Sequence, residues 1–194
     1  MPDQGTKDVA ARPLGPAGQC VIAAGALGRL WIAWAPDGVV QIELSGEPAP
    51  EAVWRRRLPE LAALPERDAP ASVADLLARY FAGEPVDPAT LPVRLAGTKF
   101  QERAWRALRA VPRGAVRTYA GLAADVGSPR ATRAIGTAMG ANPLPIIVPC
   151  HRCVASGSML GGYSGGLDKK RYLLELEGVR VEGDRVLLGQ LDLL

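Results

Sequence analysis

The stretch TYAGLAADVGSPRATRAIGTAMG, residues 118–140, decides the fold of the second half of the chain. Thr118 is a typical N-cap, because its side-chain oxygen can accept a hydrogen bond from a backbone N–H of the first helical turn. Gly127 suits the left-handed position that closes a helix. Ser128 and Pro129 then predict the N-cap and first residue of a second helix that runs to the end of the stretch. Two short helices joined by a Gly-centred turn predict a helix-turn-helix.

The second of these helices has an unusual exposed face. Its apolar side chains can pack inward, whereas Arg130, Arg133 and Thr137 lie together at helical spacing among alanine and glycine. Small side chains let a helix approach its partner closely, and few long side chains are present to read base edges in the major groove. The pattern therefore favours a minor-groove contact with an inserted side chain.

The formal net charge of +3 is unevenly distributed along the chain. Residues 98–178 hold 12 Lys and Arg against 5 Asp and Glu, residues 1–97 hold 9 against 12, and residues 179–194 hold 2 against 3. A basic segment between two acidic ones suggests that the central region binds a polyanion, with nucleic acid as the first candidate. Arginines that only solvate helix faces would give the same counts, so charge alone does not decide.

Composition excludes several classes of protein. The apolar fraction of 48% and the charged fraction of 22% are ordinary for a globular protein. No apolar stretch reaches the roughly 20 residues that span a bilayer, and the first residues lack the apolar core of a signal peptide. We therefore expect a cytoplasmic protein with no membrane partner. Three cysteines, Cys20, Cys150 and Cys153, are too few for a secreted disulfide framework and should be free thiols.

Residues 1–92 are expected to form a small α/β domain. Residues 20–46 alternate β-branched and aromatic residues with turn signals, which predicts a small antiparallel meander. Ser72, followed three positions later by Asp75, resembles a capping box and predicts a helix over about 72–82. No chemistry is visible in this half of the chain.

Residues 93–194 are expected to form a mostly α-helical domain that contains the helix-turn-helix. Thr98 and Gln101 predict a capping box at the start of its first helix. A last helix is expected over about 167–177, with Gly178 as the residue that ends it.

The run NPLPIIVPCHRC, residues 142–153, places a thiol in an apolar segment. Its prolines disfavour helix and predict a short buried strand that ends at Cys150. Burial raises the pKa of a thiol unless a partner compensates, and the thiolate is the species that attacks. His151 can act as the base, but on extended chain its side chain points to the opposite face, so the two cooperate only past the strand end or through a water.

Three interpretations of this thiol stay open. Both cysteines of the segment, with His151 and the distant Cys20, could supply four zinc ligands, although neighbouring residues cannot easily point at one ion. Cys150 and Cys153 have the spacing of a redox dithiol, but not the βαβ context of that motif. As a nucleophile, Cys150 needs His151 and an orienting acid. Glu177, an unusual anion at a helix C-terminus, is the candidate acid.

The same run, followed by GGYSGGLDKKRYLLELEG at residues 161–178, closely resembles the O6-alkylguanine-DNA alkyltransferases, also called methylated-DNA–protein-cysteine methyltransferases. The resemblance begins at TKFQERAWRAL, residues 98–108, whereas residues 1–97 match only loosely. It implies that Cys150 accepts an alkyl group from O6-alkylguanine in double-stranded DNA, and less efficiently from O4-alkylthymine. The transfer would be irreversible, with a single turnover, after the base is flipped from the minor groove. No cofactor and no metal are implied.

The resemblance also implies catalytic roles for individual residues. Glu177 would orient His151, and His151 would deprotonate Cys150 through a water. Asn142 would brace the turn that joins the recognition helix to the active site. Tyr119 would donate its hydroxyl to the departing guanine.

Further residues are implied to contact the substrate or the DNA. Arg133 would fill the gap that the flipped base leaves, and a closing loop over residues 157–166 would cover that base. The other expected contacts are Arg130, Thr132, Ala134, Thr137, Cys153, Tyr163, Ser164 and Gly165. We expect a monomer, and cooperative binding along DNA is left open.

The chain departs from the family pattern at two positions. Cys153 stands where valine is common, but the expected contribution of this position is a backbone carbonyl, so the side chain should matter little. A Cys150–Cys153 disulfide could inactivate the protein under oxidation. Ala141 replaces the usual glycine before Asn142. Two alternatives to an alkyltransferase stay open. The first is a helix-turn-helix protein that binds DNA without chemistry, and the second is a dithiol oxidoreductase.

Overall fold

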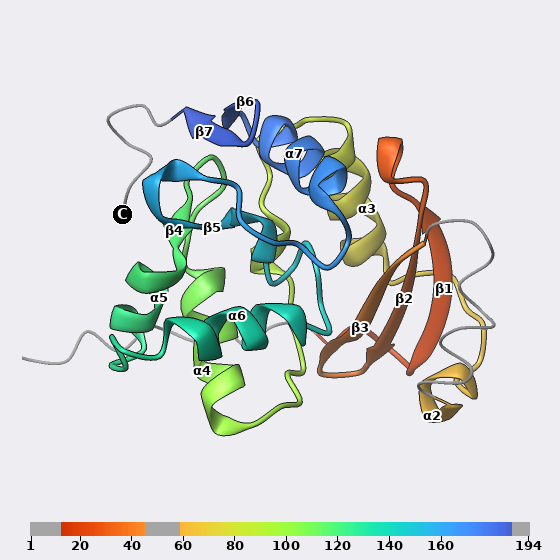
Figure 1. The fold of residues 1–194 in the computed structure, drawn as a ribbon. Coiled ribbons are helices and arrows are strands. Elements are labelled where there is room, and N and C mark those ends of the chain that lie inside the picture. The colour runs from red at the N-terminus through yellow and green to blue at the C-terminus, as the bar shows by residue number, and fades with distance from the viewer. Residues whose placement is uncertain (1–12, 46–58, 188–194) are drawn as a thin grey trace, which may run out of the picture.

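The computed structural model describes residues 13–45 and 59–187 (Figure 1). Strands β1 (Gly18–Ala23), β2 (Arg29–Ala35) and β3 (Gly38–Ser45) form an antiparallel sheet in the order β1-β2-β3. Short turns join them, as expected where glycine and proline separate alternating apolar runs. The predicted meander is therefore confirmed within the described residues.

Strand β2 is buried on both of its faces. Leu30, Ile32 and Trp34 belong to the main hydrophobic core, as the two-residue period of a strand requires. Trp31, on the other face, packs with side chains at and just after α2 (Pro59–Ala62). The sheet is thus the middle layer between that short segment and the rest of the molecule.

Helix α3 (Ala71–Phe81) lies between the sheet and the C-terminal helix (Figure 1). It begins one residue before the predicted range, and the capping box predicted from Ser72 and Asp75 is wrong. The helix starts directly after Pro70, whose carbonyl accepts the first backbone hydrogen bonds, so Ser72 already lies inside the helix. A proline at this point fixes φ and needs no N–H, which sets the start without a side-chain cap.

Helix α4 (Lys99–Arg109) has the predicted capping box. Gln101 N donates to Thr98 Oγ1 at 3.3 Å, and Thr98 N donates to Gln101 Oε1 at 2.9 Å. The apolar face of this helix is buried, and Trp105 Nε1 donates to the carbonyl of Ala138 at 2.9 Å. This bond ties α4 to the helix that follows the Gly-centred turn.

Helices α5 (Tyr119–Asp125) and α6 (Thr132–Gly140) pack against each other. Thr118 caps α5 as predicted, with Gly121 N donating to its Oγ1 at 2.9 Å. The predicted start of α6 at Ser128 is wrong. Ser128 O accepts from Ala131 N at 2.8 Å, which closes a turn with proline in its favoured second position.

The segment 142–149 contains no regular strand, so the strand predicted to end at Cys150 is also wrong. Three prolines in this segment lack the N–H that a strand ladder needs. The backbone instead turns back on itself, with Val148 N donating to Leu144 O at 2.7 Å. A single 3₁₀ turn, Cys150–Arg152, then leads into β5 (Cys153–Val154), which pairs in parallel with β4 (Arg117–Thr118).

The last elements are α7 (Leu167–Leu176) and the hairpin of β6 (Arg180–Glu182) and β7 (Arg185–Leu187). Glu177 caps α7, and Gly178 follows with φ +89°, as predicted for the end of this helix. One continuous core joins both halves of the chain, since side chains of the sheet, α3, α4, α6 and α7 belong to one buried cluster. Within the described ranges, no helix is long and apolar enough to cross a membrane.

Candidate active site

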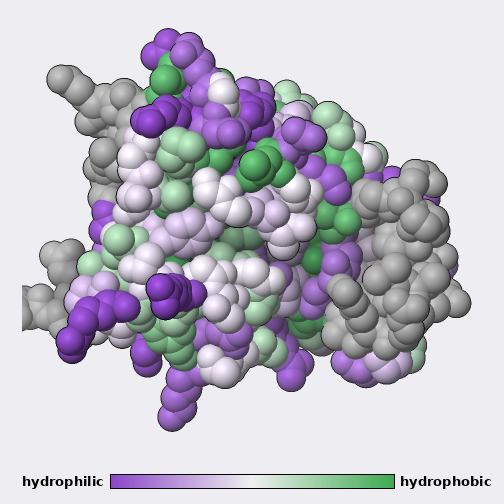
Figure 2. Space-filling view, viewed as in Figure 1, coloured by the Kyte–Doolittle hydropathy of each residue, from purple (hydrophilic) through white to green (hydrophobic). Residues whose placement is uncertain are grey.

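Cys150 opens the 3₁₀ turn and lies at a cavity of about 480 Å³. Its residue is only 5% exposed, so the thiol is reached through this cavity rather than from the open surface. The wall is formed by residues of α5, α6, the residue after β5 and the loop before α7, most of them small or aromatic: Tyr119, Gly136, Met139, Gly140, Ala155, Gly161, Gly162, Tyr163 and Ser164. Figure 2 shows this side of the molecule, where residues of intermediate hydropathy cover the middle and hydrophilic side chains lie at the edge.

Asn142 joins the sulfur to the turn that carries it. Its Nδ2 donates to Cys150 Sγ at 3.1 Å and to Val148 O at 2.8 Å, and its Oδ1 accepts from Leu144 N at 2.9 Å. Burial raises the pKa of the Cys150 thiol, whereas the Asn142 amide and the Lys170 ammonium lower it. A donor held against the sulfur favours the thiolate over the thiol.

His151 is fully buried, and its Nε2 lies 3.0 Å from Glu177 Oε1. An ionised carboxylate only accepts hydrogen bonds, so we assign the ring proton to Nε2. Nδ1 of the neutral ring is then an acceptor, and no described group of the protein donates to it. The imidazole is thereby prepared to take a proton on its other nitrogen.

Glu177 accepts hydrogen bonds from three side chains. Besides His151, Tyr80 Oη donates to Oε1 at 2.7 Å, and Arg152 donates to Oε2 through Nε and to Oε1 through Nη2, both at 2.8 Å. Burial alone would raise the pKa of Glu177, but His151 and Arg152 hold it well below its usual range. The carboxylate is therefore ionised at neutral pH.

Arg152 is buried and bridges two carboxylates. Besides Glu177, it donates to Asp87 through Nη1 at 3.1 Å and Nη2 at 2.8 Å, and to Val111 O at 2.6 Å. Burial alone would lower the pKa of Arg152, but hydrogen bonds to Glu177 and Asp87 raise it. The sequence analysis missed Arg152, although it follows His151 directly. In the structure its full burial requires paired anions, which Glu177 and Asp87 supply.

Lys170 is a second buried cation that sequence reasoning missed. Its Nζ donates to the carbonyls of Cys153 at 2.6 Å and Gly162 at 3.3 Å, and also to that of Leu160. Burial lowers the pKa of Lys170 to about 8. The ammonium fastens the loop before α7 to β5, which fixes one wall of the cavity. Nothing in the sequence predicts this role, because Lys170 stands in the first half of an amphipathic helix, where a lysine is usually exposed.

Two tyrosines of the predicted site line the cavity. Tyr119 donates its hydroxyl to Gly162 O at 3.2 Å, and burial, with the nearby Cys153 and Cys150 thiols, raises its pKa to about 12. Tyr163 also lines the cavity, and its buried hydroxyl faces the Cys150 thiol: burial, with the nearby thiol, raises the pKa of Tyr163. Gly165 matters for this ring, because a Cβ there would lie 2.8 Å from Tyr163 Cε1. Ser164 is exposed on the same wall.

The predicted DNA contacts of α6 lie on its exposed face. Thr132, Arg133, Ala134 and Thr137 are exposed, and the first two line a second cavity of about 430 Å³. This cavity shares three lining residues with the one at Cys150, namely Tyr119, Gly136 and Ala155. The two cavities therefore lie next to each other, with Gly136 of α6 in the wall of both.

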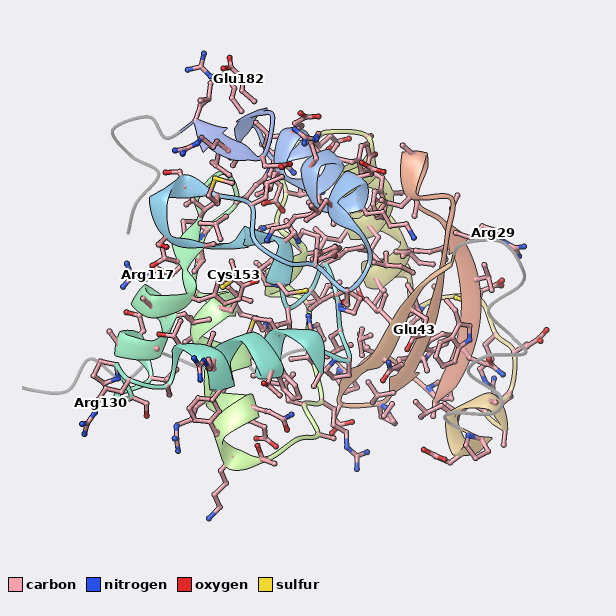
Figure 3. The ribbon with its side chains drawn as sticks, in the orientation of Figure 1. Arg29, Glu43, Arg117, Arg130, Cys153 and Glu182 are labelled. Carbon is pink, nitrogen blue, oxygen red and sulfur yellow. The ribbon has the colours of Figure 1, made fainter. Side chains whose placement is uncertain are left out.

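Two expected contacts lie elsewhere. Arg130 is not on α6 with Arg133, because it lies in the turn before the helix and points away from the molecule (Figure 3). Cys153 is the first residue of β5, is fully buried and lines neither cavity, and its carbonyl accepts the Lys170 hydrogen bond (Figure 3).

The zinc interpretation finds no support in the described ranges, because no three His, Cys, Asp or Glu side chains gather there as metal ligands would. Cys20 lies in β1 opposite Ile32, away from Cys150, and Cys150 and Cys153 are both free thiols. The arrangement of Cys150, His151 and Glu177 instead fits a nucleophile with a base and an orienting acid.

Comparison with known proteins reveals the family of the chain. Residues 99–179 match the family model of the 6-O-methylguanine DNA methyltransferase, DNA binding domain. A methylated-DNA–protein-cysteine methyltransferase of Mycobacterium tuberculosis is 45% identical over 123 residues, which cover 63% of this chain and 74% of that protein. The chain belongs to this methyltransferase family. The Salmonella typhimurium member is 49% identical over 109 residues, and the matched part spans 56% of this chain and 64% of that protein.

Solved structures extend the match beyond the methyltransferase motif. The crystal structure of the Mycobacterium tuberculosis O6-methylguanine methyltransferase superposes with a TM-score of 0.71 at 35% identity, covering 87% of this chain and 96% of that chain. The structure of Mycobacterium tuberculosis OGT in complex with DNA has a TM-score of 0.68 at 34% identity and covers 84% and 92%. The methyltransferase fold therefore includes the N-terminal sheet, which the sequence matched only loosely.

Proposed function

We propose that the protein transfers an alkyl group from O6-alkylguanine in double-stranded DNA to Cys150, in one irreversible turnover. The observation that carries this proposal is the position of the Cys150 sulfur, at a cavity wall with a buried His151–Glu177 pair behind it. Family membership supplies the class of reaction, and the cavity supplies the room for a base outside its helix.

In the proposed step, His151 Nδ1 takes the Cys150 proton through a water, while Glu177 stabilises the resulting imidazolium. The thiolate attacks the alkyl carbon in line with the carbon–oxygen bond. The new sulfur–carbon bond forms as the bond to O6 breaks, and the electron pair remains on guanine, which takes up a proton. Tyr119 is the proposed donor to the departing base, for which its hydroxyl must leave Gly162 O.

We propose that α5 and α6 act as a helix-turn-helix that binds in the minor groove. Gly136 and Gly140 on α6 could each carry a Cβ with nothing within 4 Å, so this face is open to a partner. Flipping the base costs a few kcal/mol of stacking and pairing. Arg133, beside the second cavity, would offset part of that cost by filling the gap.

The closing loop would hold the flipped base against Cys150. Tyr163 and Ser164 line the cavity, and the Tyr163 hydroxyl, which faces the Cys150 thiol, can donate to a polar atom of the base. We propose O4-alkylthymine as a slower substrate of the same site. We propose that one chain, acting as a monomer, supplies all the side chains that the displacement needs, with a water to relay the proton.

The proposal is tested with a duplex that contains one O6-methylguanine, followed by mass spectrometry of the intact protein and its peptides. We expect a gain of one methylene on the peptide that carries Cys150, and no gain in Cys150→Ala. An unmodified wild-type protein that still binds the duplex would leave only a DNA-binding function.

A further inference from the structure

We propose that Tyr80, which lies outside the family's DNA-binding segment, is a positioning residue of the alkyl-transfer site. Its hydroxyl holds the Glu177 carboxylate that orients His151. This inference rests on the proposed function and assigns a task to the N-terminal half of the chain. Helix α3, which carries Tyr80, lies beside α7, which ends at Glu177 (Figure 1).

The contact is buried and has a fixed direction. Tyr80 is fully buried, and its Oη lies 2.7 Å from Glu177 Oε1. The carboxylate cannot donate, so the tyrosine hydroxyl is the donor. Burial first, and then the negative charge of Glu177, raise the pKa of Tyr80, so the phenol keeps its proton at every working pH.

The ring of Tyr80 is held in place from two further sides. The Arg113 guanidinium lies 5.4 Å from the ring centroid, and Phe81 meets the ring edge-on at 5.3 Å. Arg113 in turn donates to Leu176 O at 2.6 Å, one residue before Glu177. The hydroxyl is therefore aimed at the carboxylate by a rigid surround.

Glu177 Oε1 receives three donors, and together they fix where this oxygen lies relative to His151. The three are Tyr80 Oη, His151 Nε2 and Arg152 Nη2. Without the Tyr80 hydroxyl, the oxygen has one contact fewer to hold it against Nε2, so the imidazole is less firmly oriented. Since His151 takes the Cys150 proton in the proposed step, a less firmly oriented ring gives less help in ionising the thiol, and the reactive thiolate then requires a higher pH.

Asp87 is the other anion near this cluster, and it also precedes the DNA-binding segment. It holds Arg152 through Nη1 and Nη2 and accepts from Arg113 N at 3.2 Å and Ala89 N at 3.0 Å. Within the described ranges, the charged or titratable groups around the His151–Glu177 pair are thus Tyr80, Asp87, Arg113, Cys150 and Arg152. Because Asp87 binds Arg152 independently of Tyr80, loss of the Tyr80 hydroxyl should leave the guanidinium in place. The lost hydrogen bond then affects only Oε1 of Glu177.

The test compares Tyr80→Phe with Tyr172→Phe, in the full chain, by the single-turnover rate of methyl transfer between about pH 6 and pH 9. Tyr172 on α7 packs against the same core and serves as the control for losing a hydroxyl. We expect Tyr80→Phe to lower the neutral-pH rate about three-fold and to move the acidic midpoint up by about half a unit, with recovery at high pH. Tyr172→Phe should match the wild type. A loss in Tyr80→Phe that is equal at every pH would overturn the inference.

A double-mutant cycle separates positioning from general stability. If Tyr80 acts through Glu177, Tyr80→Phe should change the rate little when Glu177→Gln is already present. Losses that multiply in the double variant would show a merely structural role. Thermal unfolding of each variant verifies that folded protein is compared.

A second readout distinguishes failure of this inference from failure of the proposed function. In a Cys20→Ser, Cys153→Val background, Cys150 is the only cysteine, and its reaction with an aromatic disulfide reports the reactive thiolate against pH. We expect Tyr80→Phe to shift this profile as well. A shift without methyl transfer by the wild type would remove the proposed function and leave the positioning role, whereas methyl transfer with no shift in either profile would remove the positioning role alone.

Discussion

Asn142 Nδ2 lies 3.1 Å from the sulfur of Cys150, eight residues later in the chain. The same amide group donates to Val148 O and its oxygen accepts from Leu144 N, so one side chain both shapes the turn and contacts the thiol. A substitution here should therefore affect folding and chemistry through separate contacts.

We expect Asn142→Ala to slow methyl transfer and to destabilise the protein by about 1–3 kcal/mol, because backbone groups of the turn lose their partners. The amide favours the thiolate, so its removal should also move the thiol reactivity of Cys150 to higher pH. The rate should then recover in part as the pH rises. Stopped-flow measurement of thiol reactivity gives this directly, and an unchanged pH profile would show that the amide only shapes the turn.

Lys170 provides a second prediction. Lys170→Met keeps the apolar stem but removes the ammonium that donates to three carbonyls, among them those of Cys153 and of Gly162, which keeps only the Tyr119 hydroxyl. We expect faster hydrogen exchange in the loop before α7, a slower transfer rate, and a loss of unfolding free energy of about 1–3 kcal/mol. Lys169→Met, one position earlier on the same helix, is the matched control. Equal exchange rates in the two variants would contradict the fastening role of Lys170.

Much of the fold could be predicted from local signals. Thr98 and Thr118 are N-caps in the structure because their hydroxyls bond to backbone within three residues, which the sequence shows directly. Ser72 and Ser128 also carry a hydroxyl that could cap a helix, but neither caps one in the structure, because a nearby proline fixes the backbone differently. Cap residues are thus informative only where no proline competes.

The site could be predicted only where its chemistry is close in sequence or matches the family motif. His151 and Glu177 are brought together at 3.0 Å, as the resemblance implied. Tyr80 and Asp87 lie 97 and 65 residues from the groups that they bind, and nothing local in α3 or its linker indicates such partners. Long-range hydrogen bonds to a buried charge depend on packing that the sequence pattern does not display.

Arg133 should matter for duplex DNA rather than for the chemical step. We expect Arg133→Ala to lower the repair rate in a duplex at least about ten-fold, because the gap left by the flipped base is unfilled, and to change the reaction with a free O6-alkylguanine base little. Arg29→Ala, an exposed arginine of the sheet on the opposite side of the molecule, is the control (Figure 3). Equal losses on both substrates would contradict the inserted role.

Gly136 predicts opposite effects on stability and repair. A Cβ at this position meets nothing within 4 Å, so Gly136→Ala should raise the unfolding free energy by about 0.5–1 kcal/mol, as expected inside a helix. The same methyl group would stand on the face that we propose approaches the minor groove, and duplex affinity should fall. Denaturant unfolding and a DNA titration at fixed salt measure the two effects. A variant with higher stability and undiminished affinity would place the DNA elsewhere.

Cys153 predicts sensitivity of the site to oxidation. Cys153 N closes the 3₁₀ turn onto Cys150 O, and side chains three apart in such a turn lie over one another, within the range of Cα separations that a disulfide spans. With hydrogen peroxide as oxidant, the Cys150 thiolate would form a sulfenic acid, and the Cys153 thiol would displace water from it to give the disulfide. Burial raises the pKa of Cys153 to about 12, so the second step should be slow at neutral pH and faster at higher pH.

We expect peroxide-treated protein to lose methyl transfer, to lose two hydrogens in mass, and to regain activity with a thiol reductant. Cys153→Val should instead pass to the irreversible sulfinic acid, and wild-type protein that stays active after peroxide would remove the disulfide from consideration.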